Sequence, residues 1–175
     1  FFRLRPQNFP TIRIAGGARI LHKIIKHDLI NVMLKKFIEI HNHKVLINSV
    51  RNLFVIPADG YWVKHFVFDK PAAEDIKYFI GSSRADEILA NVILPFVYVY
   101  FELTGKKHCS QKILRVLSDV ILNTENNLVK EISESLNLID ASKRTVYYQG
   151  MIELFRSFCT KDKCSECKIG QKVFI

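Results

Sequence analysis

Apolar residues recur at helical spacing along most of this chain, so the sequence predicts a series of amphipathic helices. The first helix is predicted to follow Pro10, with Thr11 as its cap, because a proline keeps the residue before it out of helical geometry. A basic stripe and an apolar face then separate around this helix. The basic stripe consists of Arg19, Lys23 and Lys26, and the apolar face of Ile14, Ala18, Leu21 and Ile25.

The first helix contains the segment AGGA, residues 15–18. A glycine in a helix interior costs roughly 1 kcal/mol relative to alanine, so two glycines need a compensating interaction. Close helix packing and approach of the backbone to a ligand both provide one. Of these two, we expect close packing.

Two shorter helical patterns follow, at residues 29–41 and 45–54. Pro57 and Gly60 then interrupt the regularity and predict turns. The segment that continues to Pro71 is expected to contain a little extended structure.

A long helix is predicted to begin after a turn at residues 79–83, with Ser82 or Ser83 as its cap. Asp86 and Glu87 would then lie near its start, where carboxylates complement the positive end of the helix dipole.

Residues 88–103 of this helix are apolar nearly all round, which predicts a central position in the fold. Pro95 lies inside the helix, and its ring crowds the carbonyl of Asn91, so a kink is expected there. Gly105 is predicted to end the helix.

Three further helices are predicted, over residues 110–123, over a segment capped by Thr124, and over residues 142–158. The sequence therefore predicts a mainly α, multi-helix single domain with a central apolar helix and a C-terminal cysteine-rich turn. We expect residues 1–175 to form one helical domain, with residues 159–170 as a cysteine-motif tail.

Three of the four cysteines lie close together, as Cys159, Cys164 and Cys167. The two-residue gap in C-x2-C allows both thiolates of a tight turn to face one tetrahedral ion, as in structural zinc sites. A closed zinc site needs a fourth ligand, and Cys109 or the adjacent His108 is the candidate. The spacing therefore predicts a structural zinc site.

Other interpretations of the cysteines stay open. An iron–sulfur cluster uses similar spacings, and inert thiols need no ligand at all. A redox pair is less favoured, because the βαβ pattern of thioredoxin-like proteins is missing.

The net charge of +9 is unevenly distributed. Residues 1–56 contain ten Lys and Arg but only Asp28 and Glu39 as acids, whereas the rest of the chain is nearly balanced. Such a field suggests a phosphate-rich or acidic partner, although a solvated face or a face covered by an acidic segment explains it equally well. The candidate anion-binding residues are Arg3, Arg5, Arg13, Arg19, Lys23 and Lys26.

No complete active site is recognisable in the sequence. His65, near Trp62 and Asp69, is a candidate general base, but a packed, hydrogen-bonded histidine is the more common outcome. Phosphate-binding glycine loops and the common zinc-protease and hydrolase motifs are missing. Whether the chain is an enzyme is left open.

The chain is expected to be a cytoplasmic fragment of a longer protein. It begins at Phe1 and shows no secretion signal. The most apolar run, residues 88–103, is too short to span a bilayer, so no membrane association is expected.

Several segments in order resemble one bacterial family. They are LRPQNFPTIRIA, YWVKH, IGSSRADEILANVILPF, TENNLV and QGMIELFRSFCTKDKCSECKIG. The family is called domain of unknown function 2851. The resemblance implies that the chain is the C-terminal portion of a longer protein with a further N-terminal half, and that Cys159, Cys164 and Cys167 match the family's cysteine motif. Cys109 matches nothing clearly.

Two functions are therefore expected as alternatives. The first is a nucleic-acid-binding or accessory domain that binds phosphates through residues 1–56 and is stabilised by a structural metal site near its C-terminus. The second is a structural or interaction domain that docks the N-terminal half and has no activity of its own.

Overall fold

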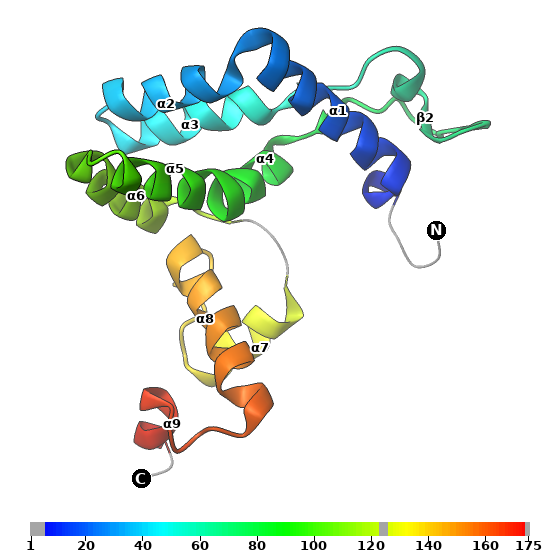
Figure 1. Ribbon diagram of the computed structural model, residues 1–175. Helices are drawn as coiled ribbons and strands as arrows, with labels where there is room; N and C mark the ends of the chain where they lie inside the picture. The colour runs from blue at the N-terminus through cyan, green and yellow to red at the C-terminus, as the bar shows by residue number, and fades with distance from the viewer. Residues whose placement is uncertain (1–5, 123–125, 174–175) are drawn as a thin grey trace. The chain divides into compact units, whose positions relative to one another are not determined.

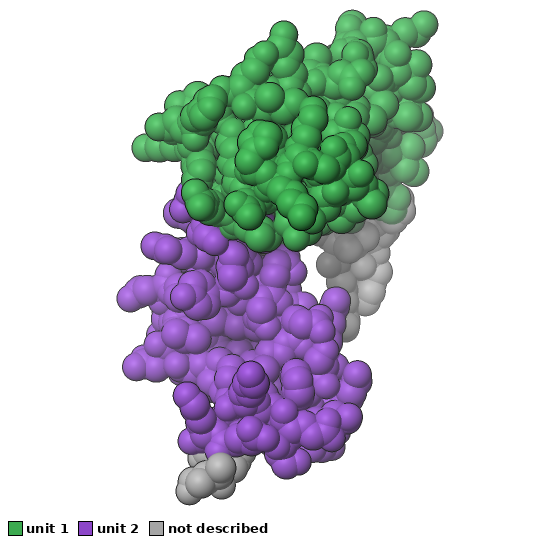
Figure 2. Space-filling view, turned by 60° about the vertical axis from the view of Figure 1, so that its left-hand side comes forward, with its two compact units in different colours: residues 1–116 green, residues 117–175 purple. Residues whose placement is uncertain are grey.

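The structure is a computed structural model that describes residues 6–122 and 126–173 (Figure 1). The predicted mainly α, multi-helix fold is confirmed. The chain divides into two compact units, residues 1–116 and 117–175, which are coloured separately in Figure 2. The predicted extent of a single domain and of a tail at residues 159–170 stays a prediction.

The first unit contains helices and two small antiparallel sheets, in which β1 pairs with β4 and β2 with β3. Its helices are α1 (Pro10–His27), α2 (Leu29–Glu39), α3 (His43–Phe54), α4 (Ser82–Ile88), α5 (Leu94–Leu103) and α6 (Lys107–Asp119). Its short helical turns are η1 (Pro6–Asn8), η2 (Gly60–Val63) and the π-helical turn η3 (Leu89–Ile93). Its strands are β1 (Ile56–Pro57), β2 (His65–Val67), β3 (Lys70–Pro71) and β4 (Tyr78–Ile80).

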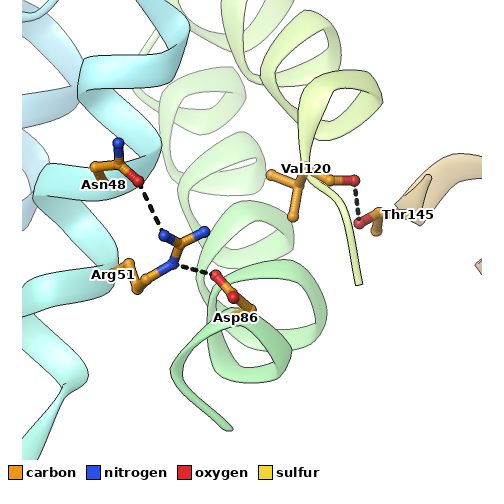
Figure 3. A network of polar contacts seen from close by, with 5 residues as sticks. All are labelled: Asn48, Arg51, Asp86, Val120 and Thr145. Atoms are coloured by element: carbon orange, nitrogen blue, oxygen red, sulfur yellow. Dashed lines mark hydrogen bonds and ion pairs between the residues drawn. The ribbon is translucent and has the colours of Figure 1, made fainter. Parts of the chain in front are cut away.

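The second unit is smaller and also helical. Its elements are α7 (Asn127–Ser135), α8 (Thr145–Ser157), η4 (Cys159–Lys161) and α9 (Lys168–Val173). The fully buried Thr145 donates its hydroxyl to the carbonyl of Val120 over 2.9 Å, which holds the start of α8 to the segment before α7 (Figure 3). Asn126 caps α7; the predicted cap, Thr124, lies outside the described residues.

Two predicted helix caps are wrong. Helix α1 begins at Pro10 itself, whose fixed φ suits the first helical position, and the Thr11 hydroxyl instead donates to the carbonyl of Phe66. Helix α4 follows Gly81, and neither Ser82 nor Ser83 caps it with a side chain. Neither helix therefore begins with the side-chain cap that the sequence predicts.

The apolar residues predicted to share one face of α1 do so, but this face does not pack on the core. The structure buries Ile12 and Gly16, on the other side of the helix, against β2 and β4. The predicted face is solvent-exposed, with exposed fractions of 71% for Ile14, 56% for Leu21 and 68% for Ile25. Helical spacing correctly predicted a stripe of apolar residues but does not show which side of the helix packs on the core.

Close packing at the AGGA segment is confirmed for one of its two glycines. A Cβ atom on Gly16 would lie 3.3 Å from Ile80 Cγ1 and 3.3 Å from Phe79 Cβ, so α1 packs on β4 more closely than a larger residue allows without a small shift. Gly17 has open space around its Cα. The second glycine therefore has no packing role among the described residues.

The long apolar helix is interrupted as predicted, and its irregularity is a π-helical turn. Leu89–Ile93 adopt this turn just before Pro95, which lies in the first turn of α5. The wider turn accommodates a residue that lacks an N–H group. Gly105, with φ of +73°, follows the end of α5 as expected. One side of the helix, including Leu94, Val97 and Phe101, is buried, and Val92, Phe96, Val99 and Leu103 are exposed.

Asp86 has a different role from the one predicted. It does not complement the dipole of α4 but forms a partly buried ion pair with Arg51 of α3 (Figure 3). Arg51 also donates to Asn48 Oδ1 over 2.9 Å. Glu87 likewise pairs with Arg84. Both carboxylates at this helix start therefore pair with arginines, Asp86 with one on another helix and Glu87 with one in the same helix.

Candidate functional site

A groove in the first unit is the candidate binding site. Its volume is about 1210 Å³, which is somewhat larger than most ligand pockets. Its walls are η1 and the start of α1, the end of β2, residues 70–77, β4 and the start of α4. Residues 72–77 are held in place because Ala72 N–H donates to Lys64 O over 2.6 Å and Ile76 N–H to Val63 O over 2.7 Å.

A polar cluster joins α1 and α4 at the edge of this groove. Arg13 Nη2 donates to Asn8 Oδ1 over 3.3 Å, and Arg84 Nη2 donates to the same oxygen over 3.2 Å. Arg84 also pairs with Glu87 within its own helix. Arg13 was predicted as an anion-binding residue, whereas Arg84 and Asn8 were missed. No local pattern marks them, because they meet Arg13 only through the fold.

The other predicted anion-binding residues do not join this cluster. Arg19 forms an ion pair with Asp59, and Lys23 Nζ donates to the carbonyl of Leu53 over 3.0 Å. Lys26 is exposed near the end of α1. Arg3 and Arg5 lie outside the described residues. Within the described chain, the early basic side chains are therefore distributed over several surroundings rather than gathered into one zone.

The exposed apolar stripe of α1 is a second candidate surface. We define it as Ile14, Gly17, Ala18, Leu21 and Ile25, which are all exposed. Helix α1 contains Arg13, Arg19, His22, Lys23, Lys26 and His27 but no acidic residue. The stripe therefore combines solvent-exposed apolar area with positive charge, which is typical of a surface that binds a partner.

The cysteine motif forms a compact turn between η4 and α9. The Cys167 N–H donates to Cys164 O over 3.2 Å, and Cys167 is buried while Cys159 and Cys164 are exposed. A Cβ on Gly170 would lie 2.3 Å from Cys164 O, so the start of α9 requires a glycine there. Among residues 6–122 and 126–173, no three His, Cys, Asp or Glu side chains are grouped closely enough to hold a metal ion.

Cys109 lies in the first unit, buried near the start of α6. Its Sγ lies 3.1 Å from His108 Nε2. Nearby Lys112 Nζ donates to the carbonyls of Phe37, over 2.8 Å, and Ile40. Burial lowers the pKa of Lys112 below its usual 10.5, and the Coulombic interaction with Cys109 opposes this shift. Lys112 thus joins α6 to the C-terminal end of α2.

His65 is a packed residue in this structure. Its ring stacks on Tyr61 with centroids 3.9 Å apart, and its Nδ1 lies 2.9 Å from the Tyr61 carbonyl. Asp69, the nearby acid, donates its backbone N–H to the Tyr61 hydroxyl over 2.9 Å. These contacts are those of a structural aromatic cluster that includes Trp62 and Phe68.

None of the helices in the described ranges combines the length and the apolarity that a membrane crossing requires.

Comparison with known proteins places the chain in a family. The family model described as protein of unknown function (DUF2851) matches residues 1–128, which is most of the chain. Searches of curated proteins and of solved structures found no match. The match agrees with the resemblance seen in the sequence, and the chain therefore belongs to the family described as protein of unknown function (DUF2851).

Proposed function

We propose that this chain is a protein-interaction domain that binds an amphipathic helix with acidic flanks along the exposed stripe of α1. The observation that carries the proposal is the exposure of Ile14, Leu21 and Ile25, apolar side chains at helical spacing on one side of α1. Exposed apolar patches of this kind mark partner surfaces in soluble proteins.

The shape of the stripe suits a helix as partner. Gly17 and Ala18 lie in its middle, and no atom lies within 4 Å of the Cβ position of Gly17. Small residues at a crossing point allow two helix axes to approach closely, at about 8–10 Å. Ile14 and Leu21, each one turn from this gap on either side, then provide ridges that can pack into the grooves of a partner helix.

The charge of α1 determines the chemistry of the partner. Because the helix has six basic or histidine residues and no acid, an acidic helix gains favourable interactions and a basic one is repelled. His22 and Lys26 follow one border of the stripe. We propose that this acidic helix belongs to the N-terminal half that the family resemblance implies.

Co-expression of residues 1–175 with that N-terminal half tests the proposal. Fully burying a Leu or Ile side chain contributes about 1.5–3 kcal/mol. More than half of each side chain is still exposed and can be buried by a partner. The double variant Leu21→Ser with Ile25→Ser should therefore lose about 2–4 kcal/mol of binding free energy. The dissociation constant should rise roughly 30- to 700-fold. Val45→Ser, at a comparably exposed position of α3, is the matched control and should leave binding unchanged. The proposal fails if the halves do not associate, or if both variants bind equally well.

Nucleic-acid binding is a second candidate function, favoured by the absence of acidic residues from α1. A nucleic acid would contact Lys26 and Arg13 through its phosphates, and each neutralised phosphate would add about 0.9 to the slope of log K against log salt for duplex DNA. A titration at low salt tests this. Absence of binding, or binding that salt does not weaken, counts against it.

We also propose that the cysteine turn holds a structural zinc ion through Cys159, Cys164 and Cys167. The compact turn at Cys164 and Cys167 supports this proposal, since a C-x2-C turn suits a tetrahedral ion.

Elemental analysis of the purified protein distinguishes the interpretations of the cysteines. Near-stoichiometric zinc supports the proposal, iron indicates a cluster instead, and the absence of both metals rejects a metal site. Gly170→Ala should lower the metal content, because its Cβ would collide with Cys164 O. Gly150→Ala, in open space on α8, is the control and should retain the metal.

A further inference from the structure

The groove of the first unit contains two arginines in an arrangement that the interaction function does not explain. The Nη2 atoms of Arg13 and Arg84 both donate to Asn8 Oδ1, so they lie no farther apart than the sum of the two distances, 6.5 Å. The shared acceptor is a neutral amide. Asn8 therefore positions the two guanidinium groups without neutralising their mutual repulsion.

The charge balance around the pair leaves it positive. Glu87 pairs with Arg84, whereas Arg13 has no acidic partner among the described residues. On another wall of the groove, the positive charges of Lys70 and Lys77 are balanced by the negative charges of Glu74 and Asp75. Two guanidinium groups with one carboxylate favour an oxyanion between them, because guanidinium forks match the geometry of phosphate oxygens.

The rest of the groove is suited to an apolar group. Phe9 and Ile12 line it on the α1 side, and Phe66, Phe79 and Ile88 line it from β2, β4 and α4. Ligand pockets combine such apolar walls with a few polar groups that orient the ligand. A ligand with an anionic head and an aromatic or aliphatic body would use both parts.

We propose that this groove binds a phosphate monoester with an apolar body, its phosphate between Arg13 and Arg84 and its body against Phe9 and Phe66. A monoester carries up to two negative charges, which matches two guanidinium groups better than the single charge of a carboxylate or a phosphodiester. Gly17 belongs to both the groove lining and the stripe of α1, but Arg13 and Arg84 lie outside the stripe, so the proposal does not depend on the docking function.

Calorimetric titration of the full chain with phenyl phosphate tests the proposal. Inorganic phosphate tests binding of the phosphate group without the phenyl ring, and benzoate tests a singly charged aromatic anion. We expect phenyl phosphate to bind most tightly, with a dissociation constant below about 1 mM. Its affinity should rise from about pH 5 to about pH 7.5, as the second phosphate proton with a pKa near 6 is lost. Benzoate should show no such rise.

Variants locate the site. Arg13→Gln and Arg84→Gln should each lower the affinity for phenyl phosphate about 10- to 100-fold, which is the usual effect of losing hydrogen bonds to a charged group. Arg84→Lys should lie between wild type and Arg84→Gln, because it retains the charge but not the fork. Arg115→Gln removes a charge from an exposed position of α6 and should leave affinity unchanged. Circular dichroism should confirm that each variant is folded.

Three results would overturn the proposal. The first is no binding of phenyl phosphate by the folded wild type, and the second is equal weakening by Arg115→Gln. The third is binding of a DNA oligonucleotide that depends on Arg13 and Arg84 while phenyl phosphate does not bind, which would assign the groove to nucleic acid. Association with an acidic helix partner should be unaffected by Arg84→Gln, so failure here and failure of the docking function can be told apart.

Discussion

Asp86→Asn should destabilise the first unit more than an equivalent change on its surface. Asp86 accepts from Arg51 Nε, and the pair joins α3 to α4 (Figure 3). The exposed fraction is 28% for the Arg51 side chain and 11% for that of Asp86. The substitution retains the shape of the side chain but removes its charge, which leaves the guanidinium group partly buried without a counter-charge.

The magnitude follows from this intermediate burial. Removing one partner of a fully buried ion pair costs about 3–5 kcal/mol, and losing a hydrogen bond between charged groups costs about 1.5–3 kcal/mol. Arg51 retains some solvent contact and its bond to Asn48. We therefore expect a loss of about 2 kcal/mol in the free energy of unfolding, or about 8 °C in Tm for a unit of this size.

Urea unfolding followed by circular dichroism measures this loss, and the chain provides a matched control. Asp59→Asn breaks another Arg–Asp pair, that of Arg19, in which the side chains are 48% and 54% exposed. Exposed pairs contribute about 0–1 kcal/mol, so the control should change stability little. If both variants lose the same stability, or neither does, burial of the Arg51–Asp86 pair does not determine its contribution and the reasoning is refuted.

Two further predictions concern single residues of the first unit. Gly17→Ala should raise the free energy of unfolding by about 1 kcal/mol through helix propensity, whereas Gly16→Ala should be less stable than Gly17→Ala by at least about 1 kcal/mol because its Cβ meets Ile80 and Phe79. Equal unfolding midpoints would contradict the close packing of α1 on β4. For Lys112, burial lowers the pKa in the folded protein, so the unfolded chain binds more protons below pH 10.5. The stability of wild type relative to Lys112→Met should therefore increase as pH rises through the lowered pKa towards 10.5, and a difference that is independent of pH would show that Lys112 is not desolvated.

Local patterns predicted the helical elements well. The patterns at residues 29–41 and 45–54 correspond to α2 and α3, within two residues at each end. The helix end at Gly105 and the irregularity before Pro95 were also predicted correctly. These features follow from backbone geometry that proline, glycine and apolar spacing impose on their own neighbours, so a short window of sequence is sufficient.

Side-chain partners were predicted less well. Asp86 and Glu87 look like acids that complement a helix start, but they pair with Arg51 and Arg84. Arg19 and Lys23 look like free cations, but Asp59 and the Leu53 carbonyl bind them. Each partner lies elsewhere in the fold or one turn along the same helix, and no local spacing distinguishes a paired charge from a free one.

The printed sequence was sufficient for the positions of helices and turns, because each depends on interactions between residues a few positions apart. It could not show that α1 buries Ile12 and Gly16 and exposes Ile14, Leu21 and Ile25. Nor could it show that Arg13 and Arg84 donate to the same oxygen of Asn8. Which residues are buried, and which side chains come together, depends on how segments distant in sequence pack against one another. A helix with apolar residues on two sides can bury either side, and the neighbouring elements determine which one.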